Sequence, residues 1–186
     1  MKKRFASTLL ACLMTSYGAN ALPYEESYCI VGEAGADNIT KAAAAFLGTP
    51  IENLEVNAPV ANRSISSALG KCRARYGWNE EETQLAFQFI IFSSADNVVR
   101  DQLYEKSFDV NIVDRVYKKE PALESMLGLW TLPEYRDALA DRLKEAGVPD
   151  RSGKASDLID EAMNLIRSRM LFEKVIQKLE FPFAEG

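Results

Sequence analysis

The chain has 186 residues, of which 47% are apolar and 26% charged, with 27 acidic and 22 basic side chains and no histidine. Such a length and composition are typical of one soluble globular domain, and not of a disordered segment or of two full-sized domains. The absence of histidine excludes Ser-His-Asp and Cys-His catalysis and histidine-ligated zinc or haem. The net charge of −5 disfavours a nucleic-acid binder, which needs a basic surface.

Residues 1–21 have the pattern of an export signal. Three cationic residues at 2–4 precede an uncharged, mostly apolar stretch over 5–17, and Ala19-Asn20-Ala21 is the small-x-small pattern that signal peptidases recognise. The apolar stretch is shorter than the roughly 20 residues of a membrane anchor. A lipidation box that ends at Cys12 is an alternative with a poorer match. We expect cleavage after Ala21, a single mature domain over 22–186 that is periplasmic or secreted, and no stable membrane insertion.

Cleavage changes both the charge and the cysteine content. It leaves 19 of the 22 basic residues against all 27 acidic ones, a net charge of −8, and it leaves the cysteines Cys29 and Cys72. Two cysteines in an oxidising compartment most often pair, although a free reactive thiol is an alternative. Two thiolates without histidine or a second cysteine pair make a poor metal site. We expect a Cys29–Cys72 disulfide, with no metal and no other cofactor.

Helix signals divide the first part of the mature chain. Asp37 can cap a helix that ends at Gly48. A capping-box spacing over 49–52 follows, but it opens at most a short turn because Asn57-Ala58-Pro59 stops it. The next helix is expected from about Pro59 to Tyr76, with Cys72 in its last turn.

The middle of the chain begins with a strong helix start, Asn79 followed by three glutamates at 80–82. The apolar run 85–92 indicates a central buried helix, and a core strand is the alternative because periodicity alone does not separate the two. A further segment is expected to begin at Ser94 and another at Asp109, before Pro121 breaks the pattern and a short apolar piece follows.

The last third has the clearest pattern. Pro133 leads into a helix over 134–146 that stops at Gly147, and residues 148–155 resemble a linker. Ser156 caps a long amphipathic helix that reaches about Leu179. The tail over 181–183 is aromatic and is expected to pack on the body. These signals predict an all-α fold, a compact single-domain bundle of about six to eight helices with one disulfide.

Carboxylates are the remaining candidates for catalysis, because the sequence contains no G-x-S-x-G, P-loop or C-x-x-C motif. Adjacent residues on a helix point about 100° apart, so the glutamates at 80–82 cannot flank one glycosidic bond. Asp137, Asp141 and Glu145 share one helix face and could coordinate a hard cation. The spacing is not that of a calcium loop, so a solvated acidic face is favoured.

Four basic residues lie in or near the helix that ends at Tyr76. Arg63, Lys71, Arg73 and Arg75 could form an anion or partner-docking patch. Cations near a helix C-terminus also complement the helix dipole, and we favour this second interpretation.

Two functions remain open. The first is an exported helical binding protein without catalytic activity, of an inhibitor or immunity type, whose expected partner is another protein of basic charge. Its binding surface is expected to contain the acidic residues of the last two helices, namely Asp137, Asp141, Asp157, Asp160 and Glu161. The alternative is a small carboxylate-dependent enzyme that acts on cell-wall saccharide, with a glutamate from the 80–92 helix.

Overall fold

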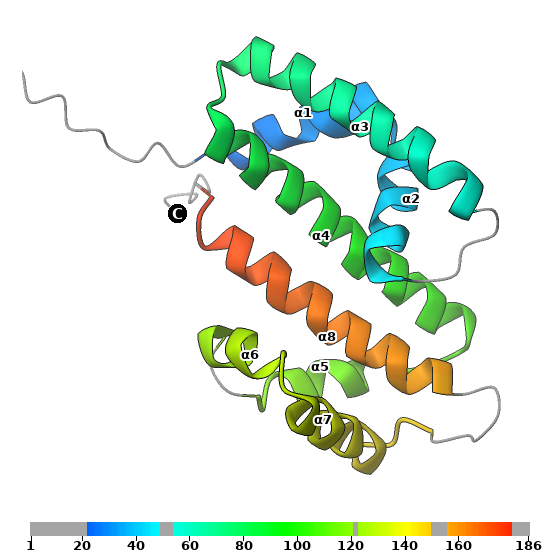
Figure 1. The fold of residues 1–186 in the computed structure, drawn as a ribbon. Helices are drawn as coiled ribbons and strands as arrows, with labels where there is room; N and C mark the ends of the chain where they lie inside the picture. Colours follow the sequence, from blue (N-terminus) through cyan, green and yellow to red (C-terminus); the bar gives the residue numbers. More distant parts are fainter. Residues whose placement is uncertain (1–21, 49–53, 121–122, 150–155, 180–186) are drawn as a thin grey trace, which may run out of the picture.

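The computed structural model describes residues 22–48, 54–120, 123–149 and 156–179 (Figure 1). Within these ranges the chain forms eight α-helices, and they confirm the all-α prediction. The helices are α1 (Tyr24–Ala34), α2 (Ala36–Leu47), α3 (Leu54–Tyr76), α4 (Glu80–Glu105), α5 (Asn111–Tyr117), α6 (Leu123–Leu129), α7 (Pro133–Glu145) and α8 (Ser156–Ile176). The expected export signal, the capping-box turn at 49–52 and the aromatic tail lie outside the described residues.

The two longest elements of the centre, α4 and α8, pack side by side and antiparallel (Figure 1). Phe89 contacts Phe172 with ring centroids 5.5 Å apart, and Lys106, directly after the end of α4, pairs with Glu161, which comes earlier in α8. The helices α1, α2 and α3 pack together on α4, whereas α5, α6 and α7 contact α8. The molecule is therefore built outward from one central helix pair.

Buried apolar side chains form two clusters along this pair. The first joins the later half of α4 to α5, α6, α7 and most of α8. The second joins α1, α2 and α3 to the earlier half of α4 and the end of α8. Phe46 of α2 packs against both clusters. Burial of apolar area on this scale supplies the main driving force for the fold.

Several predicted helix ends are confirmed. Gly48 and Gly77 follow α2 and α3 with φ of +68° and +73°, a left-handed backbone conformation that glycine adopts without steric cost. Asn79 Oδ1 accepts a hydrogen bond from the Glu82 backbone N–H (2.9 Å), and Glu82 Oε2 accepts one from the Asn79 N–H (2.7 Å). This reciprocal capping box starts α4, and the helix over 80–92 excludes the strand alternative.

Two expectations about helix boundaries are wrong, and one helix was not expected. The segment expected to begin at Ser94 is part of α4, in which the nearby Ala95, Val98 and Val99 are buried in the core. Helix α3 begins at Leu54 and continues through Pro59, although a proline there removes one backbone donor. Burial of Ala61, Ile65, Ala68 and Cys72 anchors it. Helix α1 was not predicted at all.

Candidate functional site

Helix α7 carries the acidic positions that the sequence singled out. Its inner side is fixed by Leu139 and Leu143, which are fully buried. Its outer side presents four exposed carboxylates, which we call the acidic face of α7: Glu134, Asp137, Asp141 and Glu145. They are spaced three, four and four residues apart, so they follow one stripe along the helix. The Asp141 side chain is 70% exposed and lies 3.7 Å from Lys144 Nζ.

The three candidate acids of α8 differ from one another. Asp160 is exposed, as expected, whereas the side chain of Asp157 lies outside the described residues. The expectation that Glu161 faces solvent is wrong, because its side chain is only 15% exposed and accepts a hydrogen bond from Lys106 Nζ at 2.6 Å. The antiparallel packing of α4 and α8 brings Lys106 opposite Glu161. Glu161 therefore ties the central helices together.

A cavity of about 660 Å³ lies among α5, α6 and α7. On its wall, the Glu120 carboxylate is 3% exposed and accepts two hydrogen bonds from the Arg142 guanidinium, both at 2.9 Å. The Tyr135 hydroxyl also donates to it at 2.8 Å. Burial and the neighbouring Glu120 carboxylate raise the pKa of Tyr135 well above its ordinary value. This carboxylate is thus fully engaged within the protein.

A second cavity, of about 420 Å³, is lined by residues of α4, α5 and α8. Arg169 of α8 joins the other two helices, since Nε donates to Asp96 Oδ1 of α4 at 3.3 Å and Nη1 donates to Asp114 of α5. Arg100 Nε donates to the other oxygen of Asp96 at 2.7 Å. Burial raises the pKa of Asp96, and the Arg100 guanidinium acts in the opposite direction.

The same cavity continues along α8 past Arg169. The Tyr117 hydroxyl donates to Glu173 Oε2 at 2.8 Å, and burial followed by the Glu173 carboxylate raises the pKa of Tyr117 strongly. Phe172 and Ile176 supply apolar surface, and Lys118 completes the lining. We call this site the α8 cavity.

Little in the local sequence predicts the α8 cavity. The spacing of Asp96 and Arg100, one helical turn apart, is a signal for an ion pair on one helix. Asp96 and Arg169 are separated by 73 residues, and only the packing of α4 on α8 brings them together.

Three of the five carboxylates that line the two cavities are paired with arginine, unlike the catalytic pair of a glycosidase. Hydrolysis of a glycosidic bond needs one carboxylic acid that donates a proton and one carboxylate free to attack or to activate water. Glu120, Asp96 and Asp114 instead accept hydrogen bonds from arginine. The glutamates at 80–82, proposed as a source for the enzyme alternative, line neither cavity.

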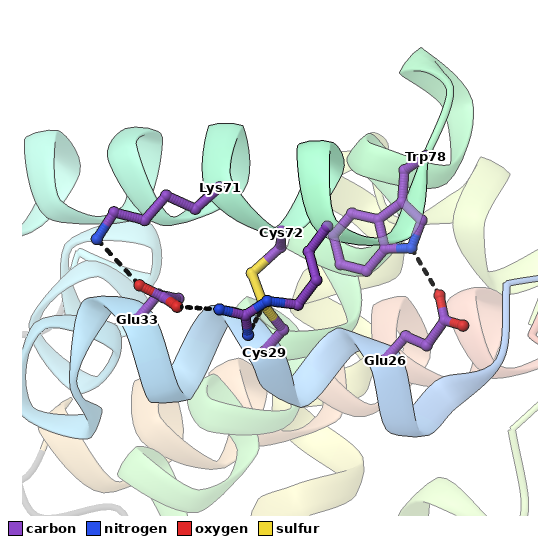
Figure 2. Close-up of a disulfide and its surroundings, with 7 residues drawn as sticks. Glu26, Cys29, Glu33, Lys71, Cys72 and Trp78 are labelled. Atoms are coloured by element: carbon purple, nitrogen blue, oxygen red, sulfur yellow. Dashed lines mark hydrogen bonds and ion pairs between the residues drawn. A yellow bond between two sulfur atoms is a disulfide. The ribbon is translucent and has the colours of Figure 1, made fainter.

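The predicted disulfide is present between α1 and α3 (Figure 2). The Cys29 and Cys72 Cα atoms are 6.0 Å apart, within the ordinary range for a disulfide. Cys72 is fully buried, and the Arg75 guanidinium lies 3.5 Å from the Cys29 sulfur.

Two of the four basic residues of α3 also bind α1. Lys71 Nζ lies 3.0 Å and Arg75 Nη2 2.7 Å from the two carboxylate oxygens of Glu33, and these contacts lower the pKa of Glu33 (Figure 2). Arg73 donates to the Trp78 carbonyl at 3.2 Å, whereas Arg63 is exposed. Lys71 and Arg75 therefore hold α1 on α3, in addition to lying near the C-terminus of α3, where cations complement the helix dipole.

None of the described helices is both long and apolar enough to cross a bilayer. Comparison of the chain with protein-family models, with curated proteins and with solved structures gives no match.

Proposed function

We propose that the protein is an exported binding protein without catalytic activity, of an inhibitor or immunity type, that docks a basic protein on the acidic face of α7. The observation that carries the proposal is the placement of Glu134, Asp137, Asp141 and Glu145 in one exposed stripe above the buried Leu139 and Leu143. A stripe on a packed helix is rigid, so little conformational entropy is lost when a partner binds.

The charge of the chain supports the same proposal. With a net charge of −8 after export, the molecule attracts basic partners over a distance limited by salt screening, to about 8 Å at physiological ionic strength. Such steering increases the association rate more than it increases the final affinity. Export itself is supported by the signal pattern at 1–21 and by the disulfide, which is typical of oxidising compartments.

The test compares two charge reversals of equal size. Asp137→Lys with Asp141→Lys changes the acidic face of α7, and Asp101→Lys with Glu105→Lys makes the same change on exposed acids of α4. Both pairs are four residues apart and both alter the net charge by +4. Each variant and the parent protein are immobilised, and capture from the cell envelope of the source organism is followed at low and high salt.

The proposal requires one protein that the parent captures less well as salt rises, and that the α7 variant loses while the α4 variant keeps it. Equal loss in both variants would attribute capture to net charge alone. The proposal would be contradicted if capture depended neither on salt nor on the α7 substitutions. It would also be contradicted if the protein turned over a cell-wall saccharide and a single Glu→Gln change abolished that turnover.

A further inference from the structure

The α8 cavity contains hydrogen-bond donors that the protein itself does not use. Its acidic groups are engaged, since Asp96 accepts from two arginines, Asp114 from Arg169, and Glu173 from the Tyr117 hydroxyl. Its basic groups are only partly engaged. Arg100 is bonded through Nε, and Lys118 has no ion-pair partner in the described part of the chain.

The lining combines these donors with apolar surface. Three cations and three carboxylates balance, so the acidic charge of the whole molecule is not concentrated here. Phe172 and Ile176 lie on the same wall helix as Arg169, one and two turns farther along. The Phe172 ring is held in place by Phe89, whose centroid is 5.5 Å away. A volume of about 420 Å³ falls within the range of small-molecule sites.

We propose that the α8 cavity binds a small amphipathic anion, a carboxylate or phosphate group attached to an apolar ring or branched chain. The terminal amino groups of Arg100 and the Lys118 ammonium hold the anion, because a guanidinium and an ammonium both make strong charge-assisted hydrogen bonds to such oxygens. The apolar part lies on Phe172 and Ile176. This site is on different helices from the acidic face of α7, so the two proposals stand or fall separately.

The test titrates the exported protein with 3-phenylpropionate and with phenyl phosphate, and follows the backbone amides by NMR. 3-Phenylpropanol keeps the ring without the charge, and propionate keeps the charge without the ring. We expect saturable shifts in α5, in α8 around 169–176 and around Arg100, with weaker binding of both control compounds. The tighter of the two anions identifies the head group.

Two neighbouring lysines supply a matched pair of variants. Both lysines are exposed, but Lys118→Gln removes a cation that lines the α8 cavity, whereas Lys119→Gln removes one that lines the other cavity. Loss of one charge-assisted contact should weaken the Lys118→Gln variant about tenfold, with no change for Lys119→Gln. Arg100→Lys, which keeps the charge but not the paired donors, should weaken binding too.

Several results would overturn the proposal. The proposal fails if neither anion binds saturably, or if the shifts are confined to other helices. It also fails if 3-phenylpropanol binds as tightly as 3-phenylpropionate, or if the Lys118→Gln and Lys119→Gln variants bind with equal affinity.

Discussion

Removal of the Cys29–Cys72 disulfide should cost a large part of the stability. The bond closes a loop with a sequence separation of 43 residues. Because the closed loop lowers the conformational entropy of the unfolded chain, the bond stabilises the folded state by about 4 kcal/mol. The Cys29→Ala, Cys72→Ala double variant avoids placing a polar group at the fully buried position 72. For a chain of this size the midpoint of thermal unfolding should fall by about 8 to 16 °C.

The assay is urea unfolding of the parent and the double variant, followed by circular dichroism, with fully reduced parent protein as the control. Because the ion pairs of Glu33 with Lys71 and Arg75 remain in the variant, α1 should still pack on α3 in the folded state, with amide exchange in α1 faster than before. Alkylation of the unreduced parent should label neither cysteine. A loss below about 1 kcal/mol would refute the entropic argument.

Four further outcomes follow from the described contacts. Glu120→Ala should lower the free energy of unfolding by about 2 kcal/mol in urea titrations, because Arg142 loses its bidentate partner but can turn to water. Arg169→Met should cost about 3 kcal/mol by the same measurement, since it leaves the partly buried Asp96 with one arginine. Because the pKa of Asp96 is raised in the folded protein, its contribution to stability is full below pH 3.8 and is lost as pH rises through the raised pKa. Asp96→Asn should therefore remove this decline from a profile of stability against pH. An unchanged profile would contradict the argument. The intact mass of the exported protein should start at Leu22, and a mature form that keeps Met1 would refute the cleavage prediction.

Local signals predicted what is decided locally. The glycine after α2 and the capping box of Asn79 specify helix ends through backbone conformation and nearby hydrogen bonds, and both are found where the sequence placed them. The disulfide was predictable because the expected export and the two cysteines left after it favour one pairing. Ser94 was misread as a helix start because the burial of α4 between its neighbours outweighs the weak helix propensity of serine.

The candidate sites depend on contacts that no short segment contains. The exposure of Asp137 and Asp141 follows from the apolar stripe of their own helix and could be predicted. The burial of Glu161 depends on Lys106, which is 55 residues away, and the α8 cavity depends on Arg169 lying between two other helices. Such pairs require knowledge of which helices pack together and in which direction.

The most direct measurement for the proposed function is the association rate of the captured partner with three forms of the protein. These are the parent, the Asp137→Lys, Asp141→Lys variant and the Asp101→Lys, Glu105→Lys variant, each measured from low to physiological salt. Thermal unfolding of all three should stay nearly unchanged, because exposed substitutions shift stability by only about 0.5 kcal/mol.

If the acidic face of α7 is the docking surface, its charge reversal should slow association at least tenfold at low salt. The reversal on α4 should have a much smaller effect, and the difference should shrink as salt rises. Equal association rates for the two variants at every salt concentration would contradict a binding site on α7.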